Sequence, residues 1–339
     1  MPVMLSARLL GQRVVVRYRR SDGLLPPLSD VVGELASLTP TTVIVAGPKG
    51  LVTVDRASIV ATRVVAPHRR QVLELERVAR RGWRAAEVLD LDGWLLHADQ
   101  GWTGRANSVL PLVTPRRPLP ELLAEVGRFY AERGLRSQIQ LPLPARGLLD
   151  AELAGRCWTL ERPTVLLTAP IGAAPGDIDE PVRLAPAPSA AWLASYHYRG
   201  GPLPEHAVRL LTRHDRVSFA SLSRDGSVAG IARGTVDAGW LGVTAVEVAP
   251  QHRRSGVAST LMRALQHWGL GQGATACYLQ VDEGNPGPWR STSSWDSSST
   301  IAITTGSPQP RAEPPAGPGP GPVGPPDGQQ ARQGAETEQ

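Results

Sequence analysis

The sequence is poor in several kinds of residue, and each shortage argues against a class of protein. Only Cys157 and Cys277 occur among 339 residues, far apart in the chain, so neither a disulfide framework nor a zinc cluster is indicated. No apolar run approaches membrane-spanning length, and the N-terminus lacks a clean signal-peptide pattern. These shortages predict a cytoplasmic protein with no metal site and no membrane partner.

Lysine is almost absent as well. Lys49 is the only one, so 35 of the 36 Lys and Arg residues are arginine. The net charge is only +5 and the arginines are scattered along the chain, which makes nucleic acid an unlikely partner. Arg17, Arg19 and Arg20 could still contact nucleic acid from an exposed strand face. An arginine-rich nucleic-acid-binding protein therefore remains a third alternative, and it predicts steep salt dependence of binding.

The residues that are present describe a globular chain of two or three domains. Hydrophobic residues make up 41% and charged residues 20% of the sequence. Residues 1–66 contain five short strand-like stretches separated by turn signals such as Ser21-Asp-Gly23, which predicts a small SH3-like β-barrel. Residues 67–178 alternate helical and strand patterns, and they include a helix that begins near Pro120 and closes at Gly134.

Within this middle region, Trp102, Arg105 and Asn107 lie around a turn-like stretch and are candidates for a site. Roles as a core aromatic and as turn polar groups explain them equally well.

Residues 246–258 are the most informative stretch of the chain. Residues 241–248 are apolar and β-branched, and Pro250 cannot continue a β-ladder, so a strand must end there. A helix is predicted from residue 255 because apolar residues follow at helical spacing on one face. These residues are Val257, Leu261, Leu265 and Trp268.

The start of that helix has the features of an anion site. Gly256 and Ala258 leave the first turn uncovered, where unpaired N–H groups and the positive end of the helix dipole point outward. Arg253 and Arg254 add positive charge, so a phosphate or pyrophosphate is the expected occupant. The alternative is an ordinary strand–helix junction with a solvated arginine pair.

The segment Arg253-Arg-Ser-Gly256-Val-Ala258 resembles the pyrophosphate loop [QR]-x-x-G-x-[GA] of the GNAT (GCN5-related N-acetyltransferase) superfamily, and Val248-Ala-Pro250 resembles the strand ending before that loop. Residues 179–288 are similar to the GNAT order of two helices, three antiparallel strands, a helix and a strand. The resemblance implies an α/β (α+β) fold with a central mixed sheet flanked by helices. Residues 67–178 resemble a degenerate GNAT-like unit, and the whole layout resembles that of an actinobacterial GNAT group with the same barrel in front.

The resemblance also implies a chemistry. Acetyl-CoA would be the co-substrate, and a primary amine of a small molecule or peptide would attack it directly in a ternary complex. Glu247 lies where several relatives place a general base, although a solvated strand carboxylate is the alternative. The residues implied in cofactor binding are Val246, Val248, Arg253, Arg254, Ser255, Gly256, Val257, Ala258, Ser259 and Asn285.

No motif identifies the acceptor. In this fold variable loops build the acceptor site, here expected near residues 196–203 and 239–240. A non-catalytic acyl-CoA-binding or regulatory module is the second alternative.

The end of the chain departs from the family. After Asn285-Pro-Gly287 a GNAT would continue as A-x-x-L-Y-x-x-x-G-F, a helix whose tyrosine usually protonates the departing thiolate. Residues 289–339 are instead rich in Ser and then in Pro and Gly, a composition that cannot bury a core and predicts a disordered tail. Tyr278 lies inside a predicted strand and is a poor substitute.

We hypothesise that the tail is read in a shifted frame. Synonymous codons for residues 288–305 can be chosen so that reading one base earlier encodes ALALYEQLGFVEHHRYHY, the missing helix followed by a strand. The codons of Trp295-Asp296 force a glycine after Leu, Met or Val, and Thr292 permits only Tyr, His, Asn or Asp at the family tyrosine. Resequencing the gene tests the hypothesis, which an uninterrupted frame with unrelated codons would overturn. A frame-restored chain should turn over on the order of a hundredfold faster.

Overall fold

The computed structural model describes residues 5, 9, 13–20, 26–65, 68–142, 145–172, 177–178, 180–198, 203–282 and 301–308. All of them belong to one compact unit, Met1–Pro308. None of the helices in these ranges is both long and apolar enough to cross a membrane. The domain limits drawn after residues 66, 178 and 288 stay predictions.

The N-terminal domain is a five-stranded antiparallel sheet. Its strands are β1 (Arg13–Arg19), β2 (Leu28–Leu38), β3 (Thr42–Gly47), β4 (Gly50–Asp55) and β5 (Ile59–Val64), with the short helix η2 (Arg56–Ser58) before β5. The strand order is β4-β3-β2-β1-β5, and alternate residues such as Val14, Val16 and Val43 are fully buried. This confirms the predicted small β domain. Arg17 forms an ion pair with Asp30 at 2.7 Å, so its charge is already partnered.

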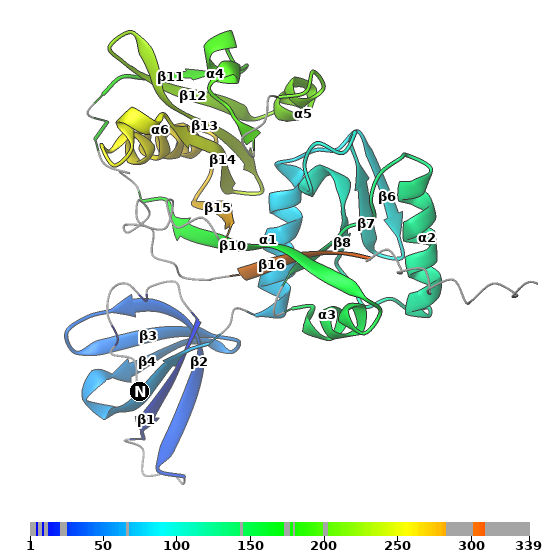
Figure 1. Ribbon diagram of the computed structural model, residues 1–339. Helices are drawn as coiled ribbons and strands as arrows, with labels where there is room; N and C mark the ends of the chain where they lie inside the picture. Colours follow the sequence, from blue (N-terminus) through cyan, green and yellow to red (C-terminus); the bar gives the residue numbers. More distant parts are fainter. Residues whose placement is uncertain are drawn as a thin grey trace, which may run out of the picture. The chain divides into compact units, whose positions relative to one another are not determined.

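The other described strands form an eleven-stranded sheet built from two halves (Figure 1). The first half contains α1 (Arg69–Arg81), β6 (Glu87–Leu91), β7 (Trp94–Ala98), η3 (Arg105–Asn107), β8 (Val109–Pro111), α2 (Leu119–Ala131), β9 (Ile139–Pro142) and α3 (Gly147–Ala154). The second half contains β11 (Val182–Ala185), α4 (Ala190–Ala194), α5 (Ala207–Thr212), β12 (Val217–Arg224), β13 (Ser227–Asp237), β14 (Trp240–Val248), η5 (Pro250–His252), α6 (Val257–Gly271) and β15 (Ala276–Asp282).

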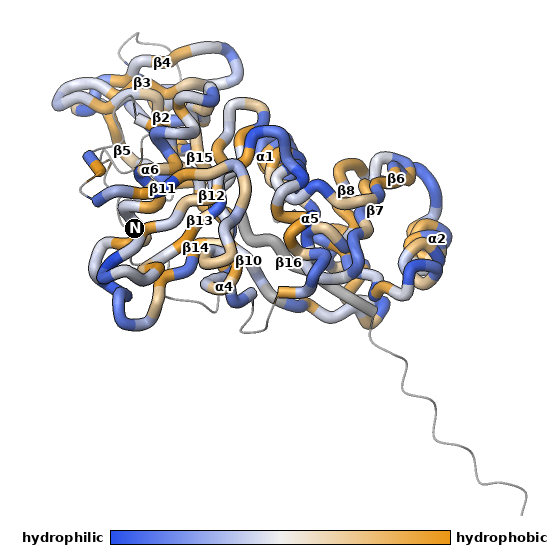
Figure 2. Tube along the Cα trace, turned by 90° about the horizontal axis from the view of Figure 1, so that it is seen from above, coloured by the Kyte–Doolittle hydropathy of each residue, from blue (hydrophilic) through white to orange (hydrophobic). Residues whose placement is uncertain are grey.

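The two halves share one pattern of strand pairing. In each, two antiparallel pairings are followed by a helix and then by a parallel pairing: β6-β7-β8, α2 and β9 in the first half, and β12-β13-β14, α6 and β15 in the second. The first half therefore repeats the pairing pattern of the second, while a separate GNAT-like unit over residues 67–178 stays a prediction. Figure 2 shows hydrophobic and hydrophilic residues interleaved along α2, as expected for a helix with one buried face.

Two strands join the halves by pairing outside their own half. β10 (Trp158–Pro170) follows the first half but pairs with β15, and β16 (Ile301–Pro308) follows the second half but pairs with β9. The two also pair with each other, so the sheet is continuous from β11 to β6. Figure 1 shows β16, in orange, beside β10.

The strand β16 corrects the prediction of a disordered tail at residues 301–308. Its sequence includes Ile301, Ile303 and two threonines, which are β-branched residues that favour strands. The backbones of β9 and β10 flank it and supply pairing partners on both sides. Residues 283–300 and 309–339 lie outside the described residues.

The helix α6 packs on β13 and β14 through the face that its sequence predicts. Val257, Leu261 and Leu265 are at most 1% exposed, and Trp268 packs against the same cluster. The helix approaches closely because Gly230 on β13 has no side chain: a Cβ there would lie 2.5 Å from Val257 Cγ1. The strands β6 and β11 were not predicted.

A charged pair lies inside the first half of the sheet. Glu76 and Arg80, one turn apart on α1, are 0% and 4% exposed. Gln140 on β9 donates its side-chain N–H to Glu76 Oε2 at 2.6 Å and accepts from Arg80 Nη2 at 2.7 Å. Burial raises the pKa of Glu76 to about 7, against the opposing charges of Arg105 and Arg80.

This pKa predicts a pH-dependent stability. A carboxyl whose pKa is 4.5 when unfolded and about 7 when folded binds its proton more tightly in the fold. Its contribution is therefore complete below pH 4.5 and is lost as the pH rises to about 7, a change of about 3 kcal/mol in the free energy of unfolding. Urea unfolding at pH 5 and pH 8 should show this loss of stability in the unaltered chain but not in Glu76→Gln. An equal change in the free energy of unfolding in both proteins would contradict the prediction.

Candidate functional site

The parallel pair β14–β15 comes apart halfway along β14. The two strands pair only from Trp240 to Val243 on β14, so residues 244–248 have no β15 partner. A β-bulge in the β13–β14 register accompanies the separation, with Ala245 in the left-handed region at φ 52°. The bulge turns the end of β14 away from β15 and leaves backbone N–H and C=O groups along one edge available to a ligand.

The loop after β14 leads to a helix start that is open to solvent. Gly256 caps α6 at φ 87°, a conformation that favours glycine, and no side chain caps the helix. A Cβ at Gly256 would meet no atom within 4 Å. The first N–H groups of α6 therefore have no intrahelical partner. Arg253 and Arg254 are both exposed.

Arg224, the last residue of β12, holds this loop in place. Its guanidinium forms two bonds with Glu180, at 2.5 and 2.8 Å. It also donates to Ser255 Oγ at 2.6 Å and to the Ser255 carbonyl at 3.2 Å, while Ser255 Oγ donates to the His252 carbonyl. The predicted cofactor residue Ser255 thus uses its side chain to shape the loop. Val257 uses its side chain in the core, which leaves only backbone groups of these two residues for a ligand.

Glu247 is held by His197. The backbone N–H of His197 donates to Glu247 Oε2 at 2.7 Å, and His197 Nδ1 lies 3.1 Å from Oε1. The Glu247 side chain is 31% exposed and the His197 side chain 60% exposed. An ionised carboxylate can only accept a hydrogen bond, so the neutral imidazole donates from Nδ1–H. Its other nitrogen, Nε2, is then unprotonated.

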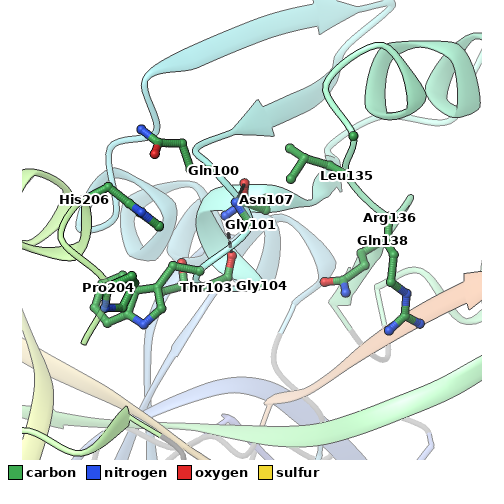
Figure 3. Close-up of a pocket in the computed structure, with 12 residues that line it drawn as sticks. Gln100, Gly101, Thr103, Gly104, Asn107, Leu135, Arg136, Gln138, Pro204 and His206 are labelled. Atoms are coloured by element: carbon green, nitrogen blue, oxygen red, sulfur yellow. Dashed lines mark hydrogen bonds between the residues drawn. The ribbon is translucent and has the colours of Figure 1, made fainter. Parts of the chain in front are cut away.

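Aromatic rings pack around the segment that carries His197. Trp102 lies 5.2 Å from Tyr198 and 6.3 Å from Tyr196, measured between ring centroids, and Trp83 contacts Trp102 from the other side. Burial raises the pKa of Tyr196, so its hydroxyl stays protonated. Trp102 also lines a cavity of about 480 Å³ between the two halves, which is shown in Figure 3.

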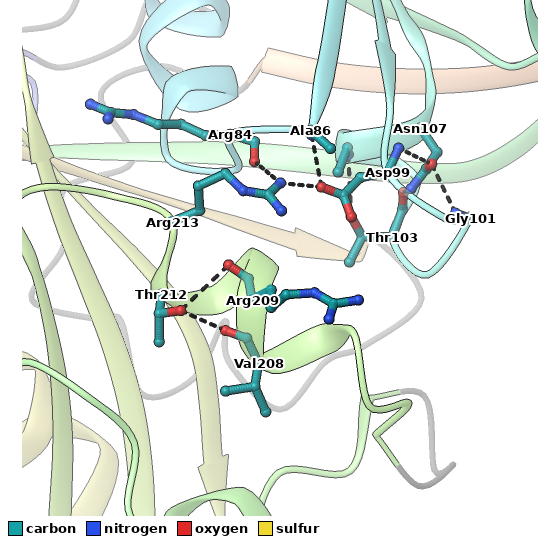
Figure 4. Close-up of polar contacts among 11 residues, drawn as sticks. Arg84, Ala86, Asp99, Gly101, Thr103, Asn107, Val208, Arg209, Thr212 and Arg213 are labelled. Carbon is teal, nitrogen blue, oxygen red and sulfur yellow. Dashed lines mark hydrogen bonds and ion pairs between the residues drawn. The ribbon is translucent and has the colours of Figure 1, made fainter.

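Arginines hold the two halves together beside this cavity (Figure 4). Arg213, after α5, forms an ion pair with Asp99 and donates to the Arg84 carbonyl at 3.0 Å. The Asp99 side chain is 1% exposed and also accepts from the Ala86 N–H at 2.8 Å. Arg84 itself pairs with Asp215 at 2.9 Å. These contacts fix the turn that follows β7.

The three residues singled out in that turn have different roles. Asn107 is structural, because its side-chain oxygen accepts from Asp99 N and Gly101 N and its amide donates to Thr103 O. Burial lowers the pKa of the Arg105 guanidinium, which lies within electrostatic range of Glu76 and of the Tyr198 hydroxyl. Of these three residues, Trp102 is the one that both lines the cavity and contacts the ring of Tyr198, near Glu247.

The structure brings only part of the predicted site together. Glu247, Val246 and Val248 share the unpaired end of β14, and residues 253–259 follow it directly. Asn285 lies outside the described residues. Gly239 and Trp240, predicted near the acceptor, stand at the opposite end of β14, about 23 Å from Glu247 at roughly 3.3 Å per residue.

Two residues beside the candidate site were not singled out. His197 was included only in the acceptor loop expected near residues 196–203, and no motif marks Arg224. The carboxylate that Arg224 binds, Glu180, is 44 residues away.

A strand that separates from its parallel neighbour at a bulge and runs into an uncapped, cationic helix start defines an N-acetyltransferase of the GNAT class. Comparisons with known proteins lead to the same class and to a family within it. Residues 70–293 match the family described as "Probable histone acetyltransferase Rv0428c C-terminal", and residues 8–63 match "Rv0428c N-terminal Sm-like domain". The chain belongs to this Rv0428c family of acetyltransferases, and its predicted SH3-like barrel is the domain that the family describes as Sm-like.

Individual relatives agree. The probable histone acetyltransferase Rv0428c of Mycobacterium tuberculosis is 34% identical over 285 residues, which cover 83% of this chain and 90% of the relative. The uncharacterized N-acetyltransferase YobR of Bacillus subtilis is 25% identical over 63% of this chain and 89% of its own length. A GCN5-related N-acetyltransferase from Kribbella flavida shares the fold, with a TM-score of 0.54 and 19% identity over 71% of this chain and 97% of that structure.

Proposed function

We propose that the chain transfers an acetyl group from acetyl-CoA to a primary amine, by direct attack in a ternary complex. The observation that carries this proposal is the separation of β14 from β15 after Val243, next to the open start of α6. Bound acetyl-CoA supplies the activated acetyl thioester. The chain's own residues bind it, orient the amine and move the proton.

The residues present fit the co-substrate. The free N–H groups at the start of α6, with Arg253 and Arg254 beside them, suit a pyrophosphate. Val246 is 41% exposed on the unpaired end of β14 and offers apolar contact to the pantetheine arm. The unpaired backbone groups of residues 244–248 suit its two amides.

We propose that Glu247 and His197 act as a pair to accept the proton that the amine loses. A primary amine must lose a proton as it becomes an amide, and His197 Nε2 is the basic atom that the pair presents to solvent. Glu247 holds the imidazole in the required tautomer and stabilises the imidazolium that forms. Glu247 thus acts as the base through His197 instead of taking the proton directly.

The acceptor of the mycobacterial relative is named in its description as a histone. A protein lysine is therefore one candidate acceptor, and a small-molecule amine is the other. The second candidate function is acyl-CoA binding without turnover. It is favoured by residues 289–300, which depart from the family helix that carries the acidic tyrosine.

Calorimetric titration with acetyl-CoA tests the binding half of this proposal. Replacing Arg253 and Arg254 together by Gln should weaken binding about 10- to 100-fold, because charge-assisted hydrogen bonds to the pyrophosphate are lost. Arg128→Gln, on the exposed face of α2, is the control and should leave Kd unchanged. Thiol release with a panel of amines then separates an enzyme from a binding module. Failure to bind acetyl-CoA would refute both functions.

A further inference from the structure

The cavity between the two halves has the size and lining of a ligand site. Its volume of about 480 Å³ lies within the usual range for small-molecule pockets. Figure 3 shows Pro204 and His206 on one side and Leu135, Arg136 and Gln138 on the other. The turn that follows β7 forms its floor and is held by the Asn107 hydrogen bonds described above.

The groups that the cavity offers are hydrogen-bonding groups without a net charge. The side-chain amides of Gln100 and Gln138 each provide both donors and acceptors, and neither bonds to another described residue. His206 Nε2 is buried and has no hydrogen-bond partner in the part of the chain that the structure describes. A buried polar nitrogen without a partner is costly unless a ligand or water satisfies it.

The charges around the cavity are already paired. Arg136 at its rim forms an ion pair with Glu161 at 2.8 Å. Asp99, beneath the floor, is paired with Arg213 and almost fully buried. A ligand would therefore meet amides, an imidazole and an indole face, a combination that suits a hydroxylated ring better than a chain of cations.

Trp102 connects this cavity to the groups assigned to the chemistry. It lines the cavity, and its indole packs on Tyr196 and Tyr198, the two residues on either side of His197. A ligand that packs on Trp102 would therefore lie against the cluster of rings that flanks His197.

We propose that this cavity binds the body of the acceptor, and that the acceptor is a hydroxyl-rich amine such as an amino sugar instead of a polycationic lysine tail. Gln100, Gln138 and His206 bond its hydroxyl groups, and Trp102 covers one face of its ring. The substrate class rests on the acetyl transfer proposed above, while the binding site itself is measurable without turnover.

The test measures binding and turnover separately, with D-glucosamine, spermidine and a lysine-rich peptide as probes. Calorimetric titration should give binding of glucosamine that Gln138→Leu and His206→Phe each weaken about tenfold, the effect of one lost hydrogen bond to a buried site. Arg128→Gln is again the control. In thiol-release assays the same two variants should raise KM for glucosamine while the KM for acetyl-CoA stays unchanged.

The outcomes separate this inference from the proposed function. Glucosamine binding that depends on Gln138 and His206 supports the cavity even if no acetyl group is transferred, in which case the proposed function fails alone. Acetyl transfer that prefers spermidine or the peptide, or that is insensitive to both variants, overturns the inference and leaves the proposed function standing. Absence of glucosamine binding to the unaltered chain also overturns it.

Discussion

Replacing Glu247 by Gln should lower kcat/KM for acetyl transfer about 10²- to 10⁴-fold, the usual contribution of a positioned base. The substitution keeps the size of the side chain but removes the charge that fixes the proton on His197 Nδ1. It also removes the stabilisation of the imidazolium. Binding of acetyl-CoA should be unchanged, because the loop at residues 253–259 does not depend on this carboxylate. A thiol-release assay with a reactive amine measures the rate.

The same prediction extends to His197. His197→Gln should cost as much as Glu247→Gln, and the double variant should cost little more than either, because two groups that act as a unit are not additive. Glu132→Gln, on an exposed helix end, is the control.

Two results would contradict the assignment. Full activity in Glu247→Gln would make Glu247 the solvated strand carboxylate of the alternative interpretation. Full activity in His197→Gln alone would mean that Glu247 accepts the proton directly or through water.

The largest expected loss of stability comes from Arg233→Met. Arg233 is completely buried in β13 and donates to the Leu211 carbonyl at 2.8 Å and twice to the Gly82 carbonyl at 3.1 Å. Its guanidinium also lies 5.2 Å from the Trp83 ring. Methionine fills a similar volume but leaves both carbonyls without donors, at about 1–3 kcal/mol each. The free energy of unfolding should therefore fall by about 3–5 kcal/mol, measured by urea denaturation.

A neighbouring arginine provides the control. Arg81 pairs with Asp237 at 3.1 Å and also links α1 to the second half, but its side chain is 47% exposed. Arg81→Met should therefore cost less than about 1 kcal/mol. Equal losses in the two variants would show that burial does not set the contribution of these links.

The parts of the site that sequence predicts are those with local signals. The strand before Pro250, the anion-binding loop from Arg253 and the buried face of α6 are each set within a few residues, by β-branching, by Gly256 and by helical spacing. The resemblance to the family rests on this segment together with the order of helices and strands predicted over residues 179–288.

The parts that sequence misses depend on contacts between distant residues. His197 and Glu247 are 50 residues apart, and Arg213 and Asp99 are 114 apart, and nothing in their local sequences indicates that they meet. The strand β6 was missed for another reason. Its Val88 and Leu89 are both exposed, so its sequence lacks the alternation that marks a half-buried strand.

The strand β16 has a consequence for how damage to this gene would be detected. Its place between β9 and β10 is secured by backbone pairing on both sides, and such pairing is available to almost any extended segment. On the reading-frame hypothesis, the restored frame would supply His-Arg-Tyr-His-Tyr to the first five positions of the same strand. Both proteins would then close the sheet at β16, so the pairing of this strand would not tell them apart. A lesion upstream of it would spare the closure of the sheet and would be detected as lost turnover.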